Sequence, residues 1–403
     1  MLGKFSRFIS FISRPSFIFW VYVIVAAGAA VHLEVFDIFS PYKEGSYDFI
    51  LHTSMNNYTI YQDSFFHLIQ HKTMYDYHWS EYYDLYLYSP SFPFVIMPFA
   101  LMQKYVGVVF WCVFNAVALF YAVRLLNIDE KKKVFIHWFI LLELLTAIQN
   151  VQVNPLVAAL FILTFVAFER KKVGLAALMI ASGVFIKIFG IVGASLFILY
   201  PQRLKFIAYL IFWSAIIFIS PLIFISWDEL MKQYNGWYTT IINLHTKNEG
   251  DFSAMQLLAA NLHFTLDDMG RYILQGAAVL VFCIKYIRYK SFSHPQYKLL
   301  FLSSILIWTT IFNNAVESPS FIIAITGIAI WYIADEKSKT NLALLIFALI
   351  LTSLSHSDLF PRYIRNNFVD PYALKCLPCF LIWVKVEYEL IFRKRKELQP
   401  INV

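Results

Sequence analysis

Acidic side chains gather in one segment of this chain, between two hydrophobic runs. Six acids that lie between residues 34 and 90 are Glu44, Asp48, Asp63, Asp76, Glu81 and Asp84. A carboxylate can accept the proton of a hydroxyl group while that hydroxyl attacks another molecule, so such side chains are candidates for general-base catalysis. Each acid could equally be solvated and take no part in chemistry.

Three cationic side chains stand where they could bind an anion. Lys187 lies inside the apolar run FIKIFGIV, and a lysine at the centre of a bilayer costs about 2.5 to 3.5 kcal/mol. Such a lysine indicates a functional site, unless its ammonium group reaches the membrane surface along its aliphatic stem. Arg362 and Arg365 lie between two apolar runs and suit contacts with phosphate groups or anionic lipids.

Two histidines have a spacing that could bind a metal ion. His67 and His71 are four residues apart, so a continuous helix would place both on one face, where Asp63 or Asp76 could join them. A single H-x-x-x-H pair beside a membrane is more often incidental. We therefore predict no metal site and no cofactor.

Composition indicates which elements must hold these side chains. The 403 residues are 59% hydrophobic and 15% charged, whereas soluble domains carry roughly 25% charged residues. Apolar runs recur from residue 15 to residue 392. These features predict an all-α polytopic integral membrane protein with a single transmembrane domain over residues 1–403. The net charge of +7 does not indicate nucleic-acid binding, because the basic residues form short clusters between apolar runs, as in cytoplasmic loops.

The basic clusters also predict the topology. If each cluster is cytoplasmic, the chain crosses the membrane an even number of times between clusters, with both termini in the cytoplasm. The segment 91–103 is broken by prolines and is too short for a full span at about 1.5 Å per residue, so we predict a half-helix there. The 12 predicted spans are 15–33, 106–126, 134–149, 154–168, 173–187, 188–200, 204–226, 271–286, 297–312, 319–334, 341–354 and 372–391.

This topology places the polar residues on one side of the membrane. The two long loops, 34–90 and 227–270, fall on the outer face, and we expect them to carry short interfacial helices. In the first loop, apolar residues spaced by three and four predict a helix with one apolar stripe. The stripe comprises Tyr58, Tyr61, Phe65, Leu68 and Ile69. We expect the function on the extracytoplasmic face of the plasma membrane, or of the inner membrane in a bacterium.

Three segments resemble glycosyltransferase family 87, the polyprenol-phosphate-mannose-dependent mannosyltransferases. The first is NYTIYQDS with the HLIQHKTMY and YLYSP that follow it. The second runs from QNVQVNPL to VFIKIFGIVG, and the third is NNAVESPSFIIAITGIAIWY. The resemblance runs from about residue 17 to about residue 335. The residues at positions typical of the family are Ile60, Tyr61, Met74, Tyr75, Tyr88, Ser89, Pro90, Asn154, Lys187 and Glu317.

The resemblance implies a GT-C-type bundle and an inverting hexosyltransferase. Such an enzyme passes a sugar, by family default mannose, from a polyprenyl-phosphate donor to a lipid-linked or glycan acceptor among membrane lipids. The chain contains no G-x-x-x-x-G-K-[ST], G-x-G-x-x-G or D-x-D motif for a nucleotide or nucleotide sugar, which agrees with this donor. Lys187 would then meet the donor phosphate. The other expected substrate-binding residues are Asn57, Tyr61, Tyr88, Asn154, Arg362 and Arg365.

One departure from the family leaves the catalytic base open. The family's aspartate aligns with Asn57, and an amide cannot accept the acceptor's proton. The candidates are Glu317, Asp48 and Asp63. We place Glu317 at an outer turn beside Pro319, and Asp48 in the loop ahead of the predicted helix. Asp63 lies on that helix but points away from its Asn57 face. We rank Glu317 and Asp48 ahead of Asp63.

Two other functions fit the same spans. A flippase or secondary transporter of lipid-linked saccharides would share the hydrophobic runs and the outer polar residues, although such transporters have repeated halves with paired broken helices. Altered or lost activity would explain why this chain has Asn57 where the family has an aspartate.

Overall fold

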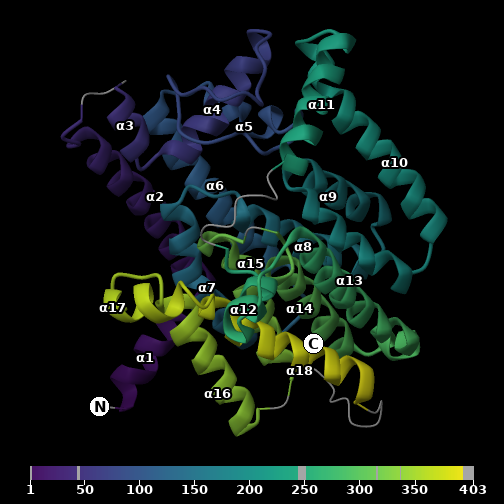
Figure 1. Cartoon of the computed structure of the whole chain (residues 1–403). Coiled ribbons are helices and arrows are strands. Elements are labelled where there is room, and N and C mark those ends of the chain that lie inside the picture. Colours follow the sequence, from purple (N-terminus) through teal and green to yellow (C-terminus); the bar gives the residue numbers. More distant parts are fainter. Residues whose placement is uncertain (1, 43–45, 244–250, 315, 336, 394–403) are drawn as a thin grey trace. The chain divides into compact units, whose positions relative to one another are not determined.

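The computed structural model of the chain describes residues 2–42, 46–243, 251–314, 316–335 and 337–393, and all regular elements within these ranges are helical (Figure 1). This confirms the all-α prediction. The chain forms two compact units. Unit 1 comprises Met1–Ala122, Ala147–Ala194 and Gln202–Thr246, and unit 2 comprises Val123–Thr146, Ser195–Pro201 and Lys247–Val403.

Unit 1 is built mainly from the first half of the chain. Its α-helices are α1 (Leu2–Ile12), α2 (Pro15–Ile38), α3 (Tyr47–His52), α4 (Asn56–Ile69), α5 (Pro93–Ala100), α6 (Lys104–Arg124), α8 (Asn154–Glu169), α9 (Val173–Ile186), α10 (Arg203–Ile219) and α11 (Trp227–Asn243). Two 3-10 helices accompany them, η1 (Ile188–Leu199) and η2 (Ser220–Ile223). The ends of α6 and η1 extend into unit 2.

Unit 2 holds the second half of the chain together with most of α7 (Glu130–Gln149). Its other α-helices are α12 (Ala254–Leu262), α13 (Asp268–Ile284), α14 (Pro295–Ile311), α15 (Phe321–Ala334), α16 (Lys339–Phe347), α17 (Arg362–Ile364) and α18 (Leu377–Phe392). The 3-10 helices are η4 (Lys285–Ser293), η5 (Ser318–Ser320) and η8 (Leu374–Cys376), and the π-helical segments are η6 (Ala348–Leu354) and η7 (Arg365–Val369).

Four helical segments of the described chain are long and apolar enough to cross a membrane. They are Pro15–Ile38, Lys104–Arg124, Arg203–Ile223 and Asp268–Ser293. These segments support a multi-pass membrane protein. Each of the twelve predicted spans contains helix, while the number that cross the membrane stays a prediction. Helix α5 has eight residues, about 12 Å at 1.5 Å per residue, which is the length of a half-helix.

Helix pairs form the core of each unit. In unit 2, α14 packs along α15, as the predicted hairpin of 297–312 and 319–334 requires. A β-carbon on Gly327 of α15 would lie 2.9 Å from side-chain atoms of Ile307 and Leu306 of α14, so glycine allows the two helices to approach closely. In unit 1, α9 runs beside α10 (Figure 1), and the Trp213 indole N–H donates to the Gly174 carbonyl oxygen at 3.1 Å.

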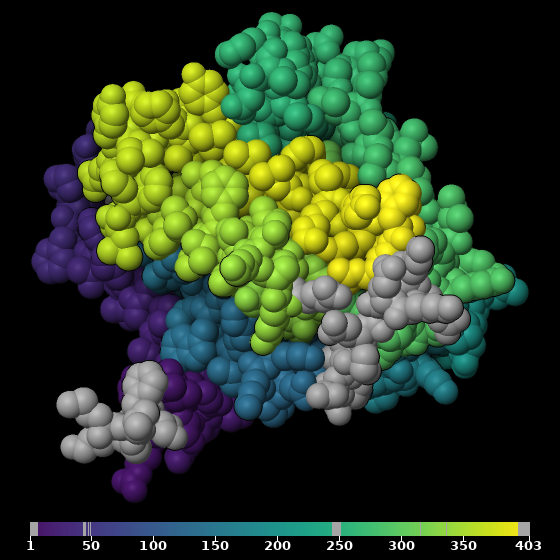
Figure 2. All heavy atoms as spheres, turned by 90° about the horizontal axis from the view of Figure 1, so that it is seen from below, coloured from purple at the N-terminus to yellow at the C-terminus, as the bar shows by residue number. Residues whose placement is uncertain are grey.

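An ion pair lies in the core of unit 2. Lys375 Nζ is 2.9 Å from Glu143 Oε1, and both side chains are fully buried although 232 residues separate them in the sequence. Removing one partner of such a pair typically costs 3–5 kcal/mol, because the remaining charge is left without compensation. The C-terminal elements around Lys375, from α16 to α18, cover a continuous part of the face seen in Figure 2, in yellow-green to yellow.

Helix α4 confirms the helix predicted in the first long loop, but its surroundings differ from the prediction. The apolar stripe is buried as far as Leu68, whereas Ile69 is exposed. Thr59, Ser64 and His67 are buried as well. The helix therefore has no solvated polar face along these positions, because the loop that follows it folds back over it.

Candidate functional site

Lys187 lies at the end of helix α9. The helix ends at Ile186, and Lys187 has an extended backbone with φ −140° and ψ 122° before η1 begins. The chain then doubles back so closely that a β-carbon on Gly190 would lie 2.3 Å from the carbonyl carbon of Gly183. The turn that the adjoining predicted spans 173–187 and 188–200 require is therefore present, and two glycines allow it.

The close contact between Gly183 and Gly190 leads us to predict that a larger residue at position 190 destabilises the protein. We expect Gly190→Ala to destabilise the protein by about 1 to 3 kcal/mol, the usual cost of overpacking a well-packed site. The matched control is Gly276→Ala, because a β-carbon there meets nothing within 4 Å and alanine favours a helix. Thermal unfolding of the purified protein in detergent measures both changes. Equal midpoints for the two variants would contradict the close contact.

The Lys187 side chain is held by polar groups at the start of helix α8. Its ammonium nitrogen lies 2.8 Å from Asn154 Oδ1 and 3.5 Å from Gln152 Oε1, and Asn154 is fully buried. The same nitrogen is 5.9 Å from the ring centroid of Tyr88 and 5.8 Å from that of Phe189, within the range of a cation–π contact. The half-buried ammonium is thus fixed by amide oxygens and aromatic rings.

Two further predicted residues join this group from α4. The Tyr61 and Tyr88 hydroxyl oxygens are 2.8 Å apart, and both side chains are buried. Asn57, one turn before Tyr61, donates through Nδ2 to the Asn150 carbonyl oxygen at 2.8 Å. The Ser89 hydroxyl donates to the Phe185 carbonyl oxygen at 2.5 Å, which anchors the Tyr88 segment to the end of α9.

The structure therefore brings together five predicted substrate-binding residues from four places in the sequence. We name them the Lys187 cluster: Asn57, Tyr61, Tyr88, Asn154 and Lys187.

Glu317 lies in unit 2, and its neighbours hold it at a fixed position in that unit. Glu317 is exposed and precedes η5. The backbone N–H of the adjacent Val316 donates to Asp251 Oδ1 at 3.1 Å, and its carbonyl oxygen accepts from the Phe252 N–H at 2.8 Å. Buried Asp251 also pairs with buried Arg271, whose Nη1 is 2.9 Å from Asp251 Oδ2.

Sequence reasoning missed Asp251 and Arg271. Asp251 stands two residues before Ser253, whose hydroxyl caps the start of α12. That N-cap could have marked Asp251 as part of a structured turn, but the pairing with Arg271 and Val316 depends on long-range packing.

Arg362 and Arg365 lie on α17 and η7, in a segment, 355–370, that we predict to be on the outer face. Arg362 is exposed and Arg365 is half-buried. Within the same segment, His356 Nε2 is 3.2 Å from Asp370 Oδ1. Burial, with the nearby charges of Lys375 and Arg365, lowers the pKa of His356 to about 3, so this histidine is neutral at ordinary pH.

The two other candidate bases lie in different settings. Asp48 is exposed, but it belongs to the first turn of α3, and the His52 Nδ1–H donates to the Asp48 carbonyl oxygen at 2.7 Å. The prediction that Asp48 lies in a loop is therefore wrong. Asp63 lies two residues beyond Tyr61 on α4, about 200° around the helix axis, and so faces away from the Lys187 cluster. Burial, followed by the charge of Glu81, raises the pKa of Asp63 to about 7.

The raised pKa of Asp63 makes stability depend on pH. The folded chain keeps a proton on Asp63 that the unfolded chain releases near the ordinary pKa of 3.8. The free energy of unfolding therefore falls as pH rises from about 4 to about 7. Above about pH 7 the full destabilisation is present. We expect Asp63→Asn to raise the thermal unfolding midpoint at about pH 8 and to leave it nearly unchanged at about pH 4. The exposed Asp76→Asn is the control, and a gain from Asp63→Asn that is equal at both pH values would contradict the raised pKa.

His67 and His71 do not form a metal-binding pair on one helix. Helix α4 ends at Ile69 and His71 has φ 59°, so the two histidines do not share a helix face. His71 instead lies 3.1 Å from Glu229 Oε1.

Comparison with known protein families now decides the assignment of this chain. The family model described as "Glycosyltransferase family 87" matches residues 86–355. The chain belongs to glycosyltransferase family 87. Membership implies a transferase that acts on a sugar donor and an acceptor. No curated protein matches the chain.

The family 87 match covers part of the candidate site. Tyr88, Asn154, Lys187 and Glu317 lie inside it, as does the loop 227–270. Asn57, Tyr61, Asp48, Asp63, Arg362 and Arg365 lie outside it. The alignment of Asn57 with the family's aspartate therefore stays a prediction.

Proposed function

We propose that this family 87 glycosyltransferase transfers a hexose, by family default mannose, from a polyprenyl-phosphate donor to a hydroxyl group of a lipid-linked or glycan acceptor. We place the reaction on the extracytoplasmic face of the plasma membrane, in a GT-C-type bundle with both termini in the cytoplasm. The observation that supports this most is the position of Lys187. The amide oxygens of Asn154 and Gln152 orient its ammonium group, and a lysine ammonium group suits a phosphate ligand.

The reaction needs a cation and a base. The acceptor hydroxyl oxygen forms a bond to the anomeric carbon of the sugar, while the bond from that carbon to the phosphate oxygen breaks. The electron pair of that bond leaves with polyprenyl phosphate, where Lys187 would stabilise the growing negative charge. A carboxylate takes the hydroxyl proton, and the sugar inverts its configuration at the anomeric carbon.

For the base we propose Glu317, followed by Asp48 and Asp63. Glu317 is an exposed carboxylate inside the region matched by the family. The backbone of its neighbour Val316 is fixed by hydrogen bonds to Asp251 and Phe252, so its position within unit 2 is well defined. Asp48 is exposed on a short helix, and Asp63 faces away from the Lys187 cluster.

The aromatic members of the Lys187 cluster would orient the substrate. The Tyr88 ring lies beside the Lys187 ammonium group and could contact the donor. Tyr61 is almost fully buried and bonds to the Tyr88 hydroxyl, so we assign it a positioning role. Arg362 and Arg365 would bind phosphate groups or anionic lipid headgroups.

Transfer from a defined donor tests the proposal. Membranes containing the full chain are offered polyprenyl phosphates that carry radiolabelled mannose, glucose or galactose, with no nucleotide sugar present. We expect the label to move from one of these donors into an acceptor fraction. The absence of transfer, together with movement of a lipid-linked saccharide across reconstituted vesicles, would favour the flippase or transporter. The absence of both would favour a family member with lost activity, as Asn57 suggests.

A further inference from the structure

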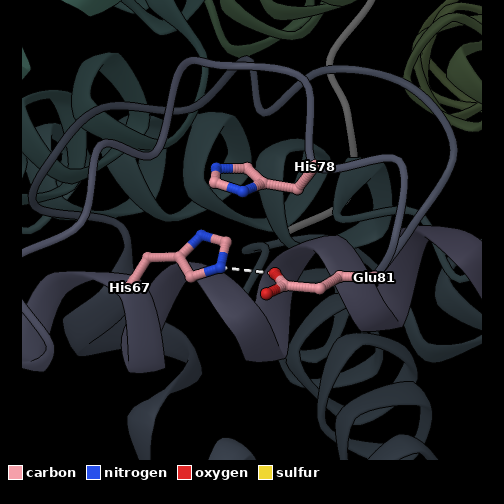
Figure 3. Close-up of side chains that lie close together, drawn as sticks. All are labelled: His67, His78 and Glu81. Carbon is pink, nitrogen blue, oxygen red and sulfur yellow. Dashed lines mark hydrogen bonds and ion pairs between the residues drawn. The ribbon is translucent and has the colours of Figure 1, made fainter.

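The loop after α4 brings two histidines and an acid together in unit 1. His67 comes from α4, whereas His78 and Glu81 come from the loop that folds back onto this helix (Figure 3). One potential ligand atom from each of the three residues lies within 4.8 Å of the others. The His67 and His78 ring centroids are 4.1 Å apart, and His67 Nε2 is 2.5 Å from Glu81 Oε2.

The environment of His78 leaves one ring nitrogen available as a ligand. His78 Nε2 is 2.9 Å from the Thr73 carbonyl oxygen. A carbonyl oxygen only accepts hydrogen bonds, so Nε2 carries the proton and Nδ1 keeps its lone pair. Histidines that bind metal ions are commonly oriented in this way, with the second ring nitrogen donating to a carbonyl or carboxylate oxygen.

The environment of His67 leaves a buried polar atom unexplained. His67 is 2% exposed, and its Nδ1 makes no hydrogen bond to any residue that the structure describes. Buried polar atoms in proteins nearly always have a partner, so an orphaned atom requires an explanation. Figure 3 shows the His78 ring above the His67 ring, and the Glu81 carboxylate beside the other nitrogen of the His67 ring, Nε2.

We propose that His67, His78 and Glu81 bind a divalent transition-metal ion, zinc in the first instance. Two imidazole nitrogens and one carboxylate oxygen form a ligand set that suits zinc, whereas magnesium and calcium prefer oxygen ligands alone. Zinc–nitrogen and zinc–oxygen distances are about 2.0 to 2.2 Å. For one ion to bind the orphaned Nδ1 of His67 and also Glu81, the Glu81 side chain must turn from Nε2 toward Nδ1. Both Glu81 and His78 are half-buried, not fully enclosed. A water molecule would take the fourth position.

One neighbouring charge competes with the ion and can move away. Lys72 Nζ is 4.0 Å from Glu81 Oε1, but the Lys72 side chain is 50% exposed and can turn into solvent. The partly buried Asp63 interacts electrostatically with Glu81 on the same side of α4, and its negative charge would favour a cation when it is ionised.

A metal ion bound by these residues would hold the loop after α4 in place against that helix. The same loop continues through Tyr75, whose hydroxyl donates to the Tyr88 carbonyl oxygen at 2.8 Å. A metal ion at His67, His78 and Glu81 would therefore stabilise the segment that presents Tyr88 to Lys187. This role is structural, and it does not require the ion to touch the sugar or the phosphate.

Metal binding by the full chain tests the proposal without an activity assay. Protein purified without a histidine tag is stripped with a chelator, dialysed and titrated with Zn²⁺, and separately with Co²⁺, whose visible absorption reports the ligand geometry. We expect one Zn²⁺ per chain, a Co²⁺ spectrum typical of nitrogen and oxygen ligands, and a higher thermal unfolding midpoint with Zn²⁺.

Variants of the half-buried ligands make the test specific. His78→Gln and Glu81→Gln should each weaken Zn²⁺ binding by more than the roughly 10–100-fold seen when only the groups that orient a ligand are changed. His71→Gln is the matched control, because His71 pairs with Glu229 instead, and it should bind Zn²⁺ like the unaltered chain. These two variants avoid the buried His67, whose replacement could unfold the loop.

Either of two results would overturn the proposal. One is an unaltered chain that binds no Zn²⁺ after stripping and titration. The other is a His78→Gln variant that binds Zn²⁺ with the same stoichiometry and affinity as the unaltered chain. Both results are independent of sugar transfer, so the metal site can fail while the glycosyltransferase proposal stands.

Discussion

Replacing Lys187 by glutamine should lower kcat/KM for a polyprenyl-phosphate donor about 10- to 100-fold. A hydrogen bond to a charged group contributes about 1.5 to 3 kcal/mol, and each 1.4 kcal/mol corresponds to a factor of ten. Glutamine keeps a donor near Asn154 but removes the positive charge, so the loss should be measured as weaker donor binding and slower transfer together. Initial rates at several donor concentrations in membranes give both values.

The Lys187 prediction needs a control that changes a lysine without changing the cluster. Lys172→Gln serves this purpose, because Lys172 is exposed just before α9 begins and we predict it to be cytoplasmic. Its kinetics should equal those of the unaltered chain. Unchanged kinetics in Lys187→Gln would mean that the lysine reaches the membrane surface without binding the donor.

Glu317→Gln should lower kcat about 10²- to 10⁴-fold, the usual contribution of general-base catalysis. Glutamine has nearly the same shape but cannot accept the proton of the acceptor hydroxyl. The effect should therefore fall mainly on kcat, with the KM for the donor little changed, whereas we expect Lys187→Gln to weaken donor binding. This difference separates the two roles within one assay.

Two matched variants decide between the candidate bases. Asp48→Asn and Asp63→Asn make the same change from acid to amide at the other two positions, and both should keep most of the transfer rate. A large loss in Asp48→Asn with normal transfer in Glu317→Gln would assign the base to Asp48. Transfer that survives each of the three changes would exclude all three carboxylates as the base.

Apolar patterning predicted the helices well, because burial in a bilayer leaves few alternatives to helix for a long apolar run. The turn at Lys187 was also predictable. A lysine inside an apolar run marks a position that must reach polar partners, and in the structure these are Asn154 and Gln152. The link from this turn to Tyr61 and Asn57 was expected only from the family resemblance.

The proposed metal site was not predictable from spacing. The four-residue interval between His67 and His71 suggested a pair on one helix face, but α4 ends at Ile69. His78 and Glu81 lie in a loop without regular structure, and such a loop has no periodicity that indicates which helix it will contact. Asp251 and Arg271 were missed for a related reason, since their pairing depends on how α12 and α13 pack.

The buried pair of Glu143 and Lys375 has a consequence for how the protein is made. Glu143 is synthesised 232 residues before its partner, and at about 5 to 20 residues per second this interval lasts roughly 10 to 50 s. During that time the Glu143 side chain must stay solvated, keep a proton or find a temporary partner among lipids or insertion factors. Unit 2 can therefore reach its final packing only when the last part of the chain has emerged, and a chain cut short before Lys375 would present cellular quality control with an unpaired acid.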